Sequence, residues 1–239
     1  MGLIQLHGLV PAQTKQKPEP ASHRLLDCGA LGALVSTLAD RNDIENPSPE
    51  ALVQWADAHN AILLAYCADG TVLPTAMGAV FSSERSLQQM LQNEAATHLR
   101  SLDRLRNIQE YTVQLHVLDP EPTAPVTAPT GRAFLDARRD QRNQRQNHKA
   151  DQIALANELL CHLQECCLQV SGTTQRKHGR LVDSAVLVKK SHLERLRNLA
   201  QTFHNAAQSL DLDLVITGPW PPYSYDLTAD LLPECCHDG

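Results

Sequence analysis

The stretch TGPWPPYSY, residues 217–225, decides how this chain is interpreted. It follows residues 212–217, whose apolar, β-branched composition predicts a strand. The three prolines of the stretch exclude a helix and a central place in a sheet, because proline has no backbone N–H to donate. Its aromatic side chains therefore lie on a stiffened backbone, suited to plugging their own domain or to contacting a partner. Both roles are compatible with the sequence.

The region before this stretch predicts a small α+β unit. Residues 181–188 are expected to form a strand, and Ser191 with Glu194 has the spacing of a helix capping box. The following helix would bury residues at helical spacing, namely Leu193, Leu196, Leu199, Phe203, Ala207 and Leu210. Residues 132–170 predict one or two further helices, whose polar middle, residues 138–152, projects into solvent.

Residues 119–130 are predicted to be an extended linker. They contain Pro120, Pro122, Pro125 and Pro129 and have no apolar periodicity. The predicted organisation is an N-terminal domain over residues 1–118, this linker, a C-terminal domain over residues 131–218, and an extended tail over residues 219–239.

The N-terminal half alternates between strand and helix signals. Strands are predicted at residues 3–10, 25–38, 71–81 and 111–117, the second broken by two glycines and the third by a proline. Ser48 and Pro49 predict the start of one helix, which Gly70 ends, and Ser82 or Ser83 predicts the start of another, reaching Leu105. The fold class expected is α+β, with a ferredoxin-like α/β sandwich whose helices cover one face of a mainly antiparallel sheet.

Composition excludes some classes of function. The net charge of -6 and the pI of about 6.0 argue against nucleic acid as a partner, which requires a surplus of Lys and Arg. No apolar run approaches the roughly 20 residues that cross a bilayer, and no leader peptide is recognised, so no membrane partner and a cytoplasmic location are expected. The seven cysteines include two adjacent pairs, which favours reduced thiols.

No residue pattern predicts an active site, so neither catalytic residues nor a cofactor is expected and the chain is predicted not to be an enzyme. His59 lies on the apolar stripe of its helix, where a buried structural histidine is more common than a catalytic one. Seven residues could suggest a metal site: Cys161, His162, Cys166, Cys167, Cys235, Cys236 and His237. Cys161 and Cys166 point to different helix faces, so no metal site is predicted. A thiol- or metal-dependent regulatory binding protein remains the alternative.

The segment GPWPPYSY resembles the C-terminal signature of the gas vesicle protein GvpF/GvpL family. Other family landmarks recur in order along the chain: LHGLVPA at residues 6–12, GALGALVSTL at 29–38, the helical His59, VLPTAMGAVFSSE at 72–84, and TGRAFL at 130–135. One departure stands out, because Thr75, Ala76 and Met77 replace a family stretch that usually contains arginine.

This resemblance implies an accessory or minor structural protein of gas vesicle assembly, which serves buoyancy. It would act by protein contacts with the shell protein and other gas vesicle proteins, at the gas vesicle or in the cytoplasm, and self-association is left open. The motif residues that could take part in interaction are Gly218, Pro219, Trp220, Pro221, Pro222, Tyr223, Ser224, Tyr225, Gly131, Arg132 and His59.

Overall fold

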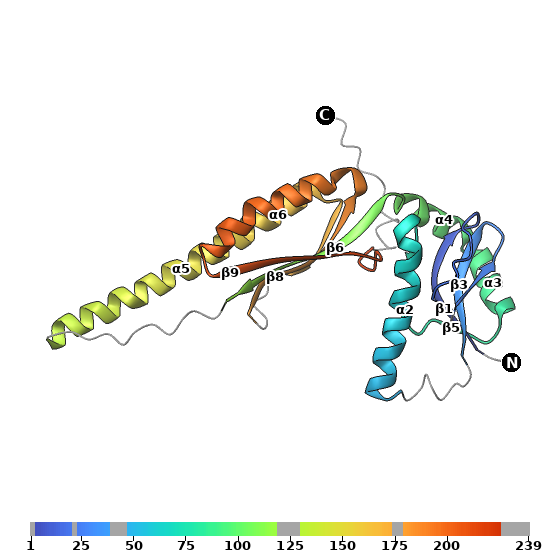
Figure 1. The fold of residues 1–239 in the computed structure, drawn as a ribbon, viewed down its shortest axis with the longest axis horizontal. Helices are drawn as coiled ribbons and strands as arrows, with labels where there is room; N and C mark the ends of the chain where they lie inside the picture. Colours follow the sequence, from blue (N-terminus) through green and yellow to red (C-terminus); the bar gives the residue numbers. More distant parts are fainter. Residues whose placement is uncertain (1–2, 21–22, 39–46, 119–129, 174–178, 226–239) are drawn as a thin grey trace. The chain divides into compact units, whose positions relative to one another are not determined.

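The computed structural model describes residues 3–20, 23–38, 47–118, 130–173 and 179–225. The chain divides into two compact units (Figure 1). Unit 1 comprises Met1–Glu110 and Pro219–Gly239, and unit 2 comprises Tyr111–Gly218. The predicted linker lies outside the described residues except for Thr130, so that boundary stays a prediction.

The sheet of unit 1 is built around strand β1 (Leu3–Pro11). β1 pairs antiparallel with β3 (Leu31–Leu38), β4 (Leu73–Pro74) and β5 (Val80–Phe81). The outer strand β2 (Arg24–Asp27) pairs with β3, which gives the order β2-β3-β1-β4. β1 therefore lies inside the sheet.

Helices cover both faces of this sheet, rather than the single face that the sequence predicts. Helix α2 (Pro49–Asp69) packs its buried side chains against Val10 and Leu34 on one face. Helices α3 (Glu84–Asn93) and α4 (Ala95–Arg104) pack against Ile4, Leu6 and other residues on the opposite face. Seven consecutive residues of β1 are buried. Because successive side chains of a strand point to opposite faces of the sheet, this burial requires a packed layer on each face.

The second helix predicted for unit 1 is divided into two. The backbone leaves helical geometry at Glu94 (φ -107°, ψ 10°), so α3 ends there and α4 begins. Leu87, Leu91 and Leu102 are buried, but Leu99, which has helical spacing with them in the sequence, remains 39% exposed. The change of direction at Glu94 explains why one continuous stripe does not describe both helices.

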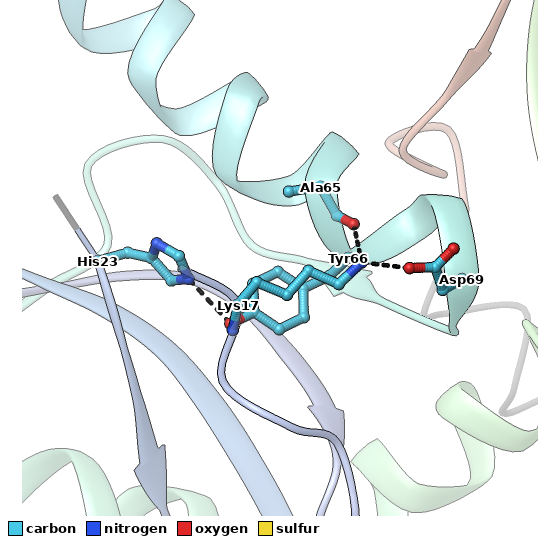
Figure 2. A network of polar contacts seen from close by, with 5 residues as sticks. All are labelled: Lys17, His23, Ala65, Tyr66 and Asp69. Carbon is cyan, nitrogen blue, oxygen red and sulfur yellow. Dashed lines mark hydrogen bonds and ion pairs between the residues drawn. The ribbon is translucent and has the colours of Figure 1, made fainter. Parts of the chain in front are cut away.

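A polar network ties the loop after β1 to the last turn of α2 (Figure 2). The Lys17 ammonium donates to the Ala65 carbonyl and pairs with the Asp69 carboxylate, both at 2.6 Å. The Tyr66 hydroxyl accepts from the Lys17 backbone N–H at 3.0 Å and lies 2.8 Å from His23 Nε2. The loop is thereby fixed over α2.

Unit 2 contains the second sheet, with strand order β7-β8-β6-β9. Its strands are β6 (Ile108–Val117), β7 (Gln169–Thr173), β8 (Arg180–Lys189) and β9 (Leu212–Trp220). The long helix α5 (Gly131–Cys166) and helix α6 (Leu193–Gln208) pack against each other and contribute to one core with β6, β8 and β9. Two antiparallel sheets with packed helices confirm the α+β class.

Three local features of unit 2 differ from the prediction. β6 pairs in the second sheet, whereas the sequence placed it with the N-terminal half. A 3-10 turn (Lys190–His192) takes up Ser191, so the predicted capping box does not form and His192 occupies the N-cap. β7 was not predicted, because the predicted helix ran to residue 170, whereas α5 ends at Cys166. Gly172 of β7 has φ +137°, and a Cβ there would lie 2.3 Å from the Asp183 carbonyl.

Candidate functional site

The C-terminal segment, Pro219–Tyr225, belongs to unit 1, and its first two residues are the last two of β9. Gly218, immediately before it, has φ +135°, a conformation that residues other than glycine rarely adopt. Pro221 and Pro222 are buried, whereas Pro219 is exposed. These two prolines thus serve as the packed part of the segment, while Trp220 and Tyr223 remain 36% and 47% exposed.

Glu110 is the main polar anchor of the segment. Its Oε2 accepts hydrogen bonds from the Ser224 backbone N–H at 2.8 Å and from the Ser224 hydroxyl at 2.7 Å. Burial raises the pKa of Glu110, and the two bonds from Ser224 oppose that shift. Next in the chain, Tyr225 packs against the core formed by β1, β2, β3 and α3–α4. The end of the segment is therefore held by both polar and apolar contacts.

His59 contacts the segment from helix α2. Its ring stacks on Tyr223, with ring centroids 6.2 Å apart, and its Nδ1 lies 2.9 Å from Nδ1 of His7. The other nitrogen of His7 lies 2.9 Å from the Ser36 hydroxyl. Burial lowers the pKa of His59, and burial together with His59 and His23 lowers the pKa of His7 to about 4. The two rings are thus held as a neutral buried pair beneath Tyr223.

Tyr223 stacks on His59 on one side and remains partly exposed. Its hydroxyl donates to Asn60 Oδ1 at 3.4 Å, and burial, with Cys67 and Glu110, raises its pKa to about 12. The phenol therefore stays protonated and keeps its hydrogen bond to Asn60.

An apolar pocket of about 160 Å³ lies beside the segment, within unit 1. Side chains from the end of α2, the region after α4 and the segment form its wall: Leu64, Cys67, Ala68, Val72, Leu105, Ile108, Trp220 and Pro222, with Gly70, Thr71, Gln109 and Pro219. The partly exposed ring of Trp220 forms one side. The arrangement suits an inserted apolar side chain, because a wall of aliphatic and aromatic groups favours removal of apolar surface from water.

Residues 75–77, which replace the arginine-containing stretch of the family, include a threonine that contacts β1. The Thr75 backbone N–H donates to the His7 carbonyl, and its hydroxyl donates to the Leu6 carbonyl, both at 3.0 Å. Thr75 thus ties β4 to β1 beside the histidine pair, whereas Met77 is 44% exposed.

The remaining motif residues belong to unit 2. Gly131 and Arg132 begin helix α5, where the Thr130 hydroxyl accepts from the Ala133 N–H at 3.2 Å, and both are exposed. The site of unit 1 therefore joins His59 with the C-terminal segment. His7, Asn60 and Glu110 complete it, and no sequence signal linked them to a motif that lies more than 100 residues away.

Among the residues that the structure describes, the cysteines at the end of α5 do not belong to a metal-binding group. Cys166 and Cys167 have sulfur atoms 3.5 Å apart, and burial raises the pKa of Cys167. In the part of the chain that the structure describes, no three His, Cys, Asp or Glu side chains are grouped to hold a metal ion. Cys235, Cys236 and His237 lie outside that part. Likewise, no helix among the described residues is both long and apolar enough to cross a membrane.

Comparisons with known proteins agree with the sequence motifs. The model of the family "Gas vesicle synthesis protein GvpL/GvpF" matches residues 6–225. "Gas vesicle protein L" of Streptomyces sp. (strain CB03234) is 24% identical over 224 residues, which is 84% of this chain and 82% of that protein.

Two solved structures share the fold. The crystal structure of the gas vesicle protein GvpF from Anabaena sp. PCC7120 has a TM-score of 0.66 and 13% identity, covering 94% of this chain and 95% of that one. GvpF from Microcystis aeruginosa has a TM-score of 0.60 and 15% identity, covering 94% and 99%. Because the family match spans nearly the whole chain, the chain belongs to the gas vesicle synthesis protein GvpL/GvpF family.

Proposed function

We propose that this protein is a non-enzymatic adaptor of gas vesicle assembly that binds the shell protein through the surface around its C-terminal segment. Membership of the family gives it an accessory role in gas vesicle synthesis. The observation that supports a specific surface is the partly exposed pair Trp220 and Tyr223 beside an apolar pocket. Aromatic side chains on a rigid backbone lose little conformational entropy when they bind.

The chemistry of a gas vesicle gives a reason for such a surface. A shell that excludes liquid water must present apolar surface to its interior, and exposed apolar surface aggregates before assembly. The pocket beside Trp220 would cover one apolar side chain of a shell subunit at a time. The nearby titratable groups are engaged in structural contacts, Glu110 with the segment and His7 with His59 of α2, which supports a binding role for this region.

The double variant Trp220→Ala/Tyr223→Ala tests the surface. Its binding to the shell protein, held soluble on a carrier domain, should fall at least about tenfold, since aromatic anchors typically contribute 1–2 kcal/mol or more each. Leu52→Ala/Val53→Ala is the matched control, because it removes apolar side chains that are 39% and 61% exposed elsewhere in unit 1. Equal binding by both variants and the wild type would refute the proposed surface.

Deletion of the gene tests the function itself. We expect few or deformed gas vesicles, restored by the wild-type gene and by the control variant. Normal vesicle number and shape in the deletion strain, with no paralogue expressed, would contradict an assembly role. Probing washed vesicles with an antibody then distinguishes retention in the shell from action during assembly only.

A further inference from the structure

Helix α5 is buried along only half of its length. The buried side chains of this 36-residue helix are Gln152, Ala156, Leu159 and Leu163. The residues before them, 131–151, are all described by the structure, and none of their side chains is buried. We call residues 131–151 the arm.

The arm begins where its packing partners in unit 2 end. Gln152 Nε2 donates to the Leu210 carbonyl at 2.8 Å, and His148 lies 3.3 Å from the Asp211 carboxylate, both in the turn after α6. Beyond these contacts α5 continues past the end of α6 (Figure 1). Most of the stability of a protein helix comes from the packing of its apolar face, which the arm lacks, so a partner would stabilise it.

The buried face of α5 continues into the arm with the same spacing. Intervals of four and three residues, which keep side chains on one face of a helix, connect the four buried positions. The same intervals lead towards the N-terminus through the exposed side chains of Lys149, Arg145, Arg142, Arg138 and Leu135. The face that is apolar against the core thus becomes cationic in the arm. We call Arg138, Arg142, Arg145 and Lys149 the cationic seam.

Charges of opposite sign are segregated around the arm. At about 100° per residue, Asp136, Asp140 and Asp151 fall on the side opposite the cationic seam. The arm holds six Lys and Arg and three Asp, while the rest of the chain holds 15 Lys and Arg and 24 Asp and Glu. Like charges at intervals of three and four residues repel, and an anionic partner would remove that repulsion.

We propose that the cationic seam is a docking surface for an acidic α-helix of another protein. The bound helix would pack on α5 beyond Asp211, where the pairing of α5 with α6 ends. Three of its four cations are arginines, whose guanidinium groups bind carboxylates with two parallel hydrogen bonds. Phe134 and Leu135, 37% and 67% exposed, provide an apolar end to the surface. Arginine combined with exposed apolar side chains is typical of protein interfaces. This surface belongs to unit 2, whereas the C-terminal segment belongs to unit 1.

The test measures binding of the full-length protein to a fluorescein-labelled helical peptide of about three heptads. The peptide carries glutamate at the heptad positions that would face the cationic seam. Arg138→Gln/Arg142→Gln/Arg145→Gln should weaken binding at least about tenfold. The matched control, Asn143→Glu/Gln144→Glu/Asn147→Glu, changes the net charge equally on the opposite face and should stay within about threefold. Lysine at the three arginine positions keeps the charge and should retain part of the affinity.

Circular dichroism of each variant shows whether the helix is kept, and glutamine is as good a helix former as arginine. Three results would overturn the proposal: no binding of the peptide by the wild type, equal weakening by the seam and control variants, or tighter binding of a DNA duplex than of the peptide. The last result would identify a nucleic acid site instead.

Discussion

Strands β1 and β6 are of nearly equal length but are buried in different ways. β1 has seven consecutive buried residues, whereas β6 alternates from Tyr111 onwards, with Val113 and Leu115 buried and their neighbours partly exposed. β1 has helices against both faces, and β6 presents its buried side chains to a single core with α5 and α6. Periodicity in a sequence therefore reports how many faces of a strand are covered, not only that it is a strand.

The two faces of β1 differ in chemistry. Ile4, Leu6 and Leu9 pack in the core with α3 and α4. Gln5 and His7 are buried although polar, and each has a polar contact on α2: Gln5 Oε1 accepts from Trp55 at 2.5 Å, and His7 meets His59. A polar strand face can be buried only where the covering helix offers such partners. The next three predictions test this contrast, and a fourth tests the C-terminal segment.

Gly8→Val should have the largest effect. A Cβ at Gly8 would lie 2.7 Å from Leu63 and 2.9 Å from the Leu73 carbonyl, so α2 and β4 would have to move. We expect a loss of about 3 kcal/mol or more in the free energy of unfolding, measured with urea. Gly131→Ala is the control, because a Cβ there has no neighbour within 4 Å. Unchanged stability of Gly8→Val would mean that α2 does not pack closely on β1.

Leu63→Ala and Leu91→Ala compare the two helix layers. Both side chains are fully buried, one on each side of the sheet, and each truncation should cost about 2–5 kcal/mol. Leu135→Ala, at an exposed position of the arm, should change stability by no more than about 0.5 kcal/mol. A small effect of Leu63→Ala alone would show that one face of the sheet is dispensable.

His7→Gln should flatten the dependence of stability on pH. The pKa of His7 is about 4 in the folded chain and near 6.5 when unfolded, so the unfolded state takes up the proton first. Stability from this group is complete above pH 6.5 and is lost as the pH falls towards 4, by up to about 3 kcal/mol. The raised pKa of Glu110 acts in the opposite direction but is common to both proteins.

Melting curves of wild type and His7→Gln between pH 7 and 4 give the comparison. A wild-type slope that persists in the variant would show that the buried pair does not control acid sensitivity. His59, whose pKa burial also lowers, would then be tested in the same way.

Trp220→Ala should have the smallest effect on stability. The side chain is 36% exposed but lines the pocket, so its removal should cost about 1–2 kcal/mol, seen as a lower melting temperature. Unchanged stability with lost binding of the shell protein would assign Trp220 to the interface alone. Lost stability with unchanged binding would assign it to anchoring.

The sequence predicted much of unit 2 and the helix starts of unit 1. Ser48 accepts from the Ala51 N–H and Ser83 from the Ser86 N–H, as caps before apolar periodicity do. The alternation in β6 is likewise confirmed. These features depend on contacts within a few residues, so local sequence contains the necessary information.

The contacts of the C-terminal segment could not be predicted. Glu110 and Ser224 are 114 residues apart in sequence, and no sequence pattern around either residue indicates that the two are in contact. The same applies to His7 and His59, which the sequence placed on separate elements without a link. Such pairs form only once the topology brings β1, α2 and the segment together.

By itself, the sequence determined the α+β class, most strands and helices, and the family, because caps, turn residues, periodicity and the GPWPPYSY signature are local. Only the tertiary structure decided that β1 is covered on both faces, that β6 pairs in the second sheet, and that the solvent-exposed polar stretch of residues 138–152 belongs to one continuous helix, α5. The physical reason is that burial is a property of packing between elements distant in sequence. A side chain such as His7 or Arg138 is therefore buried or exposed according to what lies against it, whatever its own polarity.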